Sequence, residues 1–415
     1  MRILVHTHRL ETGGSQRNAI DLAAGVRDLG HEVVVYGAPG PSLDLVHERG
    51  LEFVAAPDTG DGPTPEGMRA LRSLVESERF DLVHSYEWSQ ALTAFRALST
   101  LRVPMVFTVL SMAVPRWMPR SVPLVVGTRQ LQQSTAAWWR APVHVVEPPV
   151  DVASDEEPSD VATFATEHGL EDHADVLDLV VVSRLVEDGK VEGIRLAIDV
   201  VGDLAATSPV RLVVVGDGES VPDLARRAEA VNAAVGREAV VLTGAMTDPR
   251  PAYQLADVVL GMGGSALRGM ASSKPVVVLG VDGYSEVVDP STYEQYLWWG
   301  FLGVGHEGDA ARHLRGLVEG LADPARRAEL GTWGHERVTE DFALTALSRR
   351  LEDVYLESRD KDMVGRWGAA VESARSSSRR ALSDALPPSL KQALSGGRSG
   401  RPSAVSGGAG RPPAP

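Results

Sequence analysis

The thirty residues Asp257–Glu286, DVVLGMGGSALRGMASSKPVVVLGVDGYSE, decide the fold of this chain. Val258–Leu260 predicts a short buried strand, glycines then open a helix, and Pro275–Leu279 predicts a second strand. Glycines ahead of a helix let a ligand approach the backbone, and the helix start offers unpaired N–H groups that attract anions. The pattern therefore indicates an anion site at the carboxyl end of a strand in an open α/β sheet.

The N-terminal part of the chain follows the same rhythm. Arg2–His6 predicts a strand, Gly13 and Gly14 precede a helical pattern, and His31–Tyr36 predicts the next strand. Apolar strands separated by helices indicate a parallel sheet that is covered on both faces. We therefore expect a doubly wound, Rossmann-like domain over residues 1–150.

A second domain of the same kind is predicted further along. Residues 151–176 are rich in Pro, Asp and Glu, and we expect an interdomain linker there that runs into an irregular or helical segment. The rhythm restarts at Leu177–Val182 and indicates a second Rossmann-like domain over residues 177–341. The length of 415 residues also suggests two domains. Two open sheets joined in this way are expected to leave a ligand-binding cleft between their carboxyl edges.

The charge is unevenly distributed. The chain carries a formal charge of −15, but residues 375–415 contain seven cations and one Asp, a net charge of +6, so residues 1–374 carry −21. An acidic body argues against nucleic acid as the main partner. The Ser-, Gly- and Pro-rich basic tail over 375–415 is expected to be disordered. It could contact anionic lipid, or be a solvated tail without a partner.

Composition narrows the compartment and the chemistry. No run approaches the ~20 apolar residues of a membrane span, and the first residues lack the features of a signal peptide. The absence of cysteine excludes disulfides and thiolate metal sites, and the eleven histidines show no metal-ligand spacing. We expect a cytoplasmic protein without a metal or cofactor, with peripheral contact at the inner face of the membrane as a further possibility.

Several polar residues follow the predicted strands. Arg184 and Lys190 come after Leu177–Val182, where a guanidinium fork and an ammonium group suit a diphosphate. A solvated pair of surface cations is the alternative. His84 ends another strand and is either a cleft residue or a histidine satisfied within the fold. Glycine-rich turns add candidates for backbone contact with a nucleotide, at Gly216–Glu219 and at Gly263–Ser265.

The order of these groups resembles the glycosyltransferases of family 4, which have the GT-B fold. The resemblance covers Met1 to about Leu356. The stretches that carry it are MRILVHTHRLETGGSQRNAIDLAAGVRDLGHEVVVYG, FDLVHSYEW, VVSRLVEDGKVEGIRLAIDVV, LVVVGDGESVPDLARRA and VVLTGAMTDPRPAYQLADVVL. Each is weak alone, but together, in the family's order and on predicted strand ends, they are specific.

The resemblance implies transfer of a sugar from a nucleoside diphosphate sugar to a hydroxyl acceptor, with retention of configuration and without a metal. Arg184 and Lys190 would hold the donor diphosphate, with His84 in the cleft and Gly13 and Gly14 on the acceptor side. A helix over 342–356 would return to the N-terminal domain. Further donor contacts would come from Gly216, Thr243, Gly244, Gly263, Gly264, Ser265, Arg268 and Glu286.

The chain departs from the family pattern at the opening stretch. The family usually has two glutamates eight positions apart, and here Leu260 and Arg268 stand in their places. Leu110 and Ser111 replace a common His-Gly pair. A subset of similar enzymes has the string GGSALR, and a cation at a helix start suits a phosphate. The alternatives are a sugar-nucleotide epimerase and a non-catalytic nucleotide-sugar-binding partner subunit.

Overall fold

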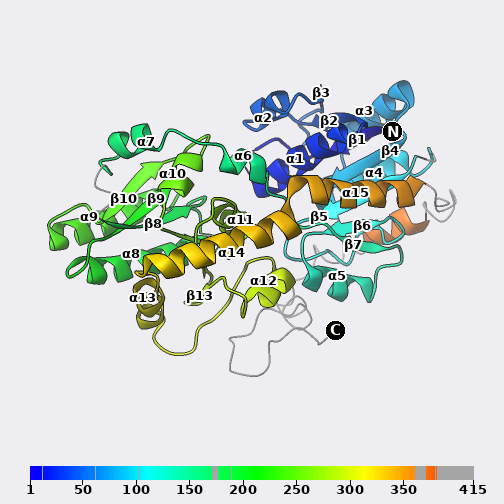
Figure 1. Cartoon of the computed structure of the whole chain (residues 1–415). Coiled ribbons are helices and arrows are strands. Elements are labelled where there is room, and N and C mark those ends of the chain that lie inside the picture. The colour runs from blue at the N-terminus through cyan, green and yellow to red at the C-terminus, as the bar shows by residue number, and fades with distance from the viewer. Residues whose placement is uncertain are drawn as a thin grey trace. The chain divides into compact units, whose positions relative to one another are not determined.

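The computed structural model describes residues 1–11, 13–60, 62–101, 103–170, 176–187, 189–359, 371–378 and 380. These residues form two compact units (Figure 1). The N-terminal unit contains Met1–Pro149 and the described residues from Leu344 onward, and the C-terminal unit contains Val150–Ala343.

The N-terminal unit is built on a seven-stranded parallel sheet in the order β3-β2-β1-β4-β5-β6-β7. The chain moves outward from β1 to β3 and then returns to pair β4 with β1, which is the reversal expected of a doubly wound sheet. The strands are β1 (Arg2–His6), β2 (Glu32–Gly37), β3 (Glu52–Ala55), β4 (Leu82–Tyr86), β5 (Met105–Val109), β6 (Leu124–Val126) and β7 (Val143–Val145).

Helices cover both faces of this sheet because alternate strand residues point to opposite sides. Leu4 belongs to one buried cluster together with Phe95, whereas Ile3 and Val5 belong to another together with Leu351. The helices of the unit are α1 (Gly14–Asp28), α2 (Leu43–Glu48), α3 (Pro65–Glu78), α4 (Glu87–Leu98), α5 (Arg129–Ala136) and α15 (Leu344–Arg359).

The C-terminal unit has a six-stranded sheet in the order β10-β9-β8-β11-β12-β13. Five strands are parallel, and the edge strand β13 runs antiparallel to β12. The strands are β8 (Leu177–Val182), β9 (Val210–Val215), β10 (Val240–Gly244), β11 (Val258–Gly261), β12 (Val276–Leu279) and β13 (Ser285–Val287). The two predicted parallel α/β sheets are thus confirmed.

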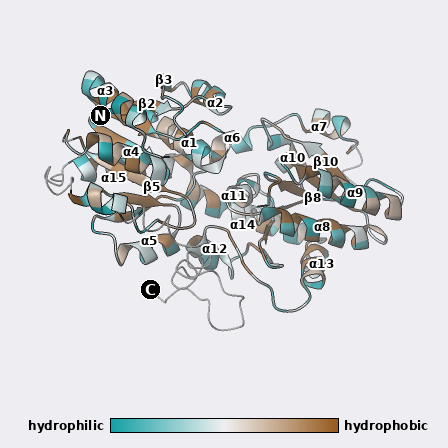
Figure 2. Cartoon of the chain, turned by 180° about the vertical axis from the view of Figure 1, so that it is seen from behind, coloured by the Kyte–Doolittle hydropathy of each residue, from teal (hydrophilic) through white to brown (hydrophobic). Residues whose placement is uncertain are grey.

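Helices again cover both faces of the sheet, and Figure 2 shows apolar strands beneath helices that carry polar segments. Val180 packs with Met270 and Phe342 on one face, and Val181 packs with Ile198 on the other. The helices are α6 (Val152–Glu156), α7 (Val161–Glu167), α8 (Lys190–Ala205), α9 (Val221–Val235), α10 (Arg250–Leu255), α11 (Gly264–Ala271), α12 (Tyr293–Trp299), α13 (Ala310–Gly320) and α14 (Pro324–Phe342).

The linker region, 151–176, contains helical segments over its described residues. Helices α6 and α7 lie there, and Val152, Phe164 and Leu170 are buried in the same cluster as Val180. A few apolar side chains among many acidic ones are enough to anchor short helices to a sheet. Residues 171–175 of the expected linker lie outside the described residues.

The end of the described chain also differs from the sequence-based expectation. One long helical pattern is divided at Ala343, which has ψ 133° and separates α14 from α15. Helix α15 packs against α1 within the N-terminal unit (Figure 1). Disorder was expected from residue 375, but residues 371–378 are helical. The remainder of that tail, apart from Arg380, lies outside the described residues.

Candidate functional site

The strand order of the C-terminal unit places two loops at one point on the sheet. Strands β8 and β11 are neighbours, and the chain leaves them toward opposite edges, to β9 and to β12. Ligands of doubly wound sheets bind at such a reversal, beyond the carboxyl ends of the strands. The loop after β8 carries Arg184, and the turn after β11 contains Gly263.

The loop between β8 and α8 is fixed by its own backbone. Buried Leu185 donates its N–H to Asp217 O at 2.9 Å and accepts the Ser220 N–H on its carbonyl at 2.9 Å. Arg184 beside it is exposed, and Lys190, the first residue of α8, is half-buried. The structure thus places both predicted cations on one anchored loop at the reversal point.

An ion-pair network that the sequence analysis missed supports this loop. Arg195 on α8 contacts the Glu187 carboxylate, and its Nε lies 2.8 Å from Asp223 Oδ2 on α9. The hydrogen bond from Arg195 lowers the pKa of Glu187, so this carboxylate stays ionised beside the loop. Ser220 Oγ also donates to Glu187 at 3.1 Å. The short separation of Glu187 and Arg195 in the sequence was one signal for their ion pair. The contact between Arg195 and Asp223 depends on tertiary packing.

Gly216 and Gly218 serve the loop rather than a nucleotide. A Cβ at Gly216, which has φ +146°, would lie 1.8 Å from Ser183 O, and one at Gly218 would lie 2.3 Å from Leu185 O. Their N–H groups donate to Gly244 O at 2.8 Å and to Asp217 Oδ1 at 2.7 Å. This corrects the expectation that the amides of this turn face a ligand, because both have acceptors within the fold.

The glycine turn before α11 is partly open. Gly263 has φ +54° and donates its N–H to Phe301 O at 2.9 Å, and Ser265 N–H donates to Met262 O at 3.2 Å. Gly264 between them is exposed, and a Cβ added there would meet no heavy atom of the described chain within 4 Å. Of the three predicted amide donors at this helix start, Gly264 is the most accessible.

The turn at Thr243 and Gly244 ends β10. Thr243 is half-buried, and its Oγ1 donates to Gly244 O at 3.2 Å. Gly244 is exposed, has φ +81° and has open space around it within the described chain. This turn lies two strands from β8 along the same carboxyl edge. Gly244 thus leaves open space at this edge, while Gly216 supports the loop after β8.

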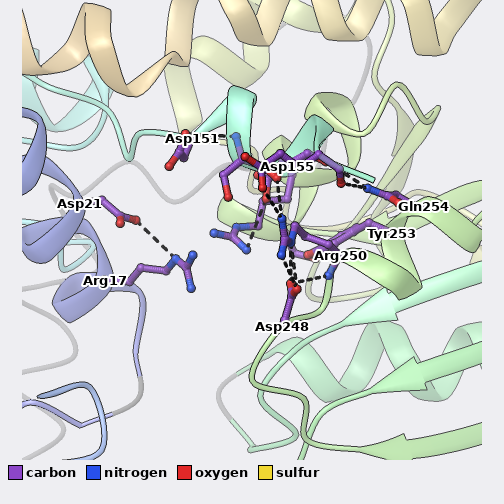
Figure 3. A network of polar contacts seen from close by, with 12 residues as sticks. Arg17, Asp21, Asp151, Asp155, Asp248, Arg250, Tyr253 and Gln254 are labelled. Atoms are coloured by element: carbon purple, nitrogen blue, oxygen red, sulfur yellow. Dashed lines mark hydrogen bonds and ion pairs between the residues drawn. The ribbon is translucent and has the colours of Figure 1, made fainter. Parts of the chain in front are cut away.

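Arg268 has a different environment from the one predicted. It lies in the last turn of α11, and its Nη1 is 3.9 Å from Asp155 Oδ1 on α6. Its side chain is 16% exposed and that of Asp155 is 5% exposed. Figure 3 shows Asp155 near Asp248 and Arg250, which form a further ion pair at 2.7 Å. The expectation of a phosphate-binding cation at the helix start is corrected, because Arg268 neutralises a buried carboxylate.

Glu286 is not brought to the reversal point. It lies on β13, and β12 separates this strand from β11. Its Oε2 is 3.9 Å from His313 Nε2, and its Oε1 accepts the Val287 N–H at 3.2 Å. Leu260, at the position of the family's first glutamate, is fully buried in β11. Neither position supplies a carboxylate at the predicted phosphate turn.

The N-terminal unit has its own polar centre at the corresponding reversal between β1 and β4. Glu87 directly follows β4 and has φ +65°, an uncommon backbone conformation for a residue with a side chain. Its carboxylate accepts hydrogen bonds from Leu110 N at 3.1 Å, Ser111 Oγ at 2.7 Å and Ser15 Oγ at 3.2 Å. Strained residues at strand ends often have functional roles, and the sequence analysis missed this one. An acidic residue immediately after a buried strand was the available signal.

His84 is two residues from the end of β4 and is 0% exposed. Its Nδ1 lies 2.6 Å from Tyr355 Oη, and its Nε2 lies 2.6 Å from Thr108 Oγ1. Burial lowers the pKa of His84 to about 3. The prediction that His84 faces a cleft is therefore wrong: both ring nitrogens are used to join β4, β5 and α15.

Gly13 and Gly14 begin α1 beside Glu87's partner Ser15. Gly13 caps the helix in an extended conformation, and its carbonyl accepts the Arg17 N–H at 3.1 Å. Gly14 is exposed, and a Cβ there would meet no described atom within 4 Å. The pair thus lies at the same sheet edge as Glu87, whereas His84 lies inside the unit.

Two searches of the described residues gave negative results. We find no helix there that is long and apolar enough to cross a membrane. Over the same residues, His, Asp and Glu do not gather in threes in a way that could hold a metal ion.

Each of the two sheets matches a family model of glycosyltransferases. Residues 12–154 match the family model described as Glycosyltransferase Family 4, and residues 177–311 match the model described as Glycosyl transferases group 1. The two matches fall on the two sheets in turn. No curated protein sequence matches the chain.

Solved structures share the whole architecture at low sequence identity. A glycosyltransferase from Rickettsia africae has a TM-score of 0.70 and 14% identity, over 87% of this chain and 99% of that one. Anabaena Alr3699/HepE in complex with UDP-glucose has a TM-score of 0.66 and 16% identity, over 86% and 100%. Sucrose-phosphate synthase from Thermosynechococcus elongatus has a TM-score of 0.64 and 17% identity, over 86% and 99%. The two family matches together support a family 4-type glycosyltransferase, and the solved structures share its GT-B fold.

Proposed function

We propose that this protein transfers a glycosyl group from a nucleoside diphosphate sugar to a hydroxyl acceptor, with retention of configuration and without a metal or cofactor. The observation that carries the proposal is the anchored loop with Arg184 and Lys190 at the reversal point of the C-terminal sheet. The Anabaena neighbour in complex with UDP-glucose supports a nucleotide sugar as the donor.

The chemistry needs stabilisation of the leaving group. As the bond between the anomeric carbon and the diphosphate oxygen breaks, the electron pair moves to the diphosphate. Arg184 and Lys190 would stabilise that charge, with the Gly264 amide as a further donor. The acceptor hydroxyl oxygen forms the new bond to the anomeric carbon, and its proton passes to the departing diphosphate oxygen. Arg268 takes no part in this proposal because it is paired with Asp155.

We assign acceptor binding to the N-terminal unit around Glu87, Gly13 and Gly14. The Glu87 carboxylate is held by three donors and would orient an acceptor hydroxyl. Glu87→Gln should then lower turnover while donor affinity stays unchanged. Equal loss of both would remove Glu87 from the acceptor side.

The donor assignment is tested by Arg184→Ala and Lys190→Ala. Each variant should lower the transfer rate at least about a hundredfold, because one lost donor to developing charge costs roughly 2.7–4 kcal/mol. Initial rates and calorimetric titrations with UDP-, GDP- and TDP-sugars provide the measurement. Arg312→Ala on α13, where the side chain is 86% exposed, is the matched control. Near-normal turnover in both variants would refute the diphosphate clamp.

A nucleotide-sugar-binding protein without transfer activity is the second candidate. It is favoured by the absence of a carboxylate at Leu260 and Arg268, the two positions where the resemblance leads one to expect glutamates. Tight donor binding that depends on Arg184, with no product from a broad acceptor panel and no donor hydrolysis, would establish this function over the first.

A further inference from the structure

A carboxylate near the end of the described chain lies buried among arginines of the N-terminal unit. Glu372, on the helical segment 371–378, is 5% exposed. Its Oε1 accepts the Arg120 N–H at 2.7 Å and contacts the Arg140 guanidinium. Arg120, Arg140, Glu372 and Arg375 line a cavity of about 110 Å³. Three cationic side chains thus surround one internal anion.

The cationic side of this cavity is held by the N-terminal unit itself. The guanidinium carbons of Arg116 and Arg120 lie 4.9 Å and 4.7 Å from the Trp138 ring centroid. Arg120 Nη2 also donates to Arg116 O at 2.9 Å. Stacking on an aromatic ring fixes the planes of both guanidinium groups. These contacts do not depend on the helical segment, so Arg116 and Arg120 stay in place without it, whereas Arg140 contacts Glu372 itself.

The Glu372 carboxylate does not form all the hydrogen bonds that its oxygens could accept. Its second carboxylate oxygen, Oε2, is buried and has no hydrogen-bond partner within the described part of the chain. A buried carboxylate oxygen without a donor weakens the contact that holds it. One carboxylate also leaves an excess of positive charge beside Arg120 and Arg140, the two cavity arginines that lie outside the helical segment. A phosphate group, with more oxygens and nearly twice the charge, complements these arginines better.

The helical segment also covers residues beside Glu87. Ser376 Oγ donates to Trp117 O, and the Arg380 guanidinium carbon lies 5.4 Å and 5.3 Å from the rings of Trp88 and Trp117. Trp88 follows Glu87 in the chain. Displacement of the segment would therefore change the surroundings of the strand end where we place the acceptor.

We infer that the cavity between Arg120 and Arg140 is a binding site for a phosphate group, and that Glu372 occupies it as an internal substitute. Segment 371–378 is then a latch that an external phosphate displaces. The phosphate belongs either to a soluble molecule or to a lipid headgroup. This inference does not depend on sugar transfer, because every contact that carries it lies within the N-terminal unit.

The first test uses the full chain and inorganic phosphate. Phosphate should raise hydrogen exchange in residues 371–378, and Glu372→Gln should raise it without phosphate and lower the phosphate Kd about tenfold. Adding Arg140→Ala to Glu372→Gln should abolish that gain. Glu319→Gln, an exposed change of the same charge on α13, should behave like the wild type. An unchanged Kd in Glu372→Gln, or unchanged exchange in 371–378 on adding phosphate, would overturn the inference.

The second test separates the two sources of phosphate. Vesicles of phosphatidylcholine with and without phosphatidylglycerol are sedimented with the wild type, Glu372→Gln and the Arg140→Ala double variant. At least fivefold more binding of Glu372→Gln to anionic vesicles, lost in the double variant, identifies a lipid headgroup. Phosphate binding in the first test without that gain identifies a soluble ligand. Failure of the first test removes the site, and leaves the donor assignment at Arg184 untouched.

Discussion

His84 shows how burial decides what a strand-end histidine does. In the folded protein its pKa is about 3, compared with an ordinary value of 6.5. Below pH 6.5 the unfolded chain therefore binds a proton that the folded protein does not. Above about pH 6.5, His84 does not lower the free energy of unfolding. Between pH 6.5 and pH 3, His84 lowers the free energy of unfolding by up to about 1.4 kcal/mol per pH unit.

His84→Asn should remove this share of the acid sensitivity. The variant loses its contacts with Tyr355 and Thr108 and should melt below the wild type at pH 7.5. The difference in melting temperature should narrow at pH 5.0, because only the wild type has the cost of keeping His84 neutral. His47→Asn on exposed α2 is the control. If the difference in melting temperature is the same at both pH values, His84 does not couple folding to pH.

Two other residues show the limit of reading single positions. Arg268 stands in the sequence where the resemblance leads one to expect a glutamate, and its partner Asp155 lies on an element that resembled a linker. Glu87 attracted no prediction, although it collects donors from the segments that follow β1 and β5. In both cases the role depends on contacts between residues far apart in the sequence.

At the scale of elements, the loop after β8 and the turn after β9 form one packed unit. Gly216→Ala would place a Cβ 1.8 Å from Ser183 O at φ +146°. We expect a loss of about 3 kcal/mol or more in stability and a loss of nucleotide-sugar affinity, because the loop with Arg184 must move. Thermal melting and donor titration measure the two effects.

Gly244→Ala is the matched control for this change. Gly244 also has a positive φ, +81°, but a Cβ there meets nothing within 4 Å in the described chain. Its cost should be limited to backbone strain, about 1–2 kcal/mol. If the two variants lose stability and affinity equally, the packing between the loops does not position Arg184.

At the scale of the whole molecule, the chain leaves the N-terminal unit after Pro149 and returns to it at Leu344. Helix α15 packs so closely on α1 that a Cβ at Gly25 would lie 1.9 Å from Ser348 Oγ. Gly25→Ala should therefore loosen α15, seen as faster hydrogen exchange over 344–359. Ser348→Gly in the same chain should restore protection.

Gly14→Ala provides the comparison on the same helix. It adds the same methyl group at an exposed position without close neighbours in the described chain. Exchange over 344–359 should not change, and stability should rise slightly because alanine loses less backbone freedom on folding. Fast exchange in both variants would mean that α15 is not held by its contact with Gly25.

Much of the architecture followed from the sequence alone. Apolar runs such as Leu124–Val126 and Leu179–Val182 fall in β6 and β8, because a strand buried on both faces needs a continuous apolar stretch. The cations Arg184 and Lys190 could be placed together because they follow the same strand, and the chain order of a doubly wound sheet brings that strand end beside the end of β11. Local pattern and topology rules were sufficient for these features.

The tertiary structure alone decided the roles of individual polar groups. It buried His84 between Thr108 and Tyr355, paired Arg268 with Asp155 and placed Glu372 among arginines. Periodicity records which face of an element is buried, but not which distant side chain it meets there. Desolvation and ion pairing depend on these contacts between distant side chains. The sequence therefore determined the two sheets and the anchored cations, and packing determined which charged groups remain available for chemistry.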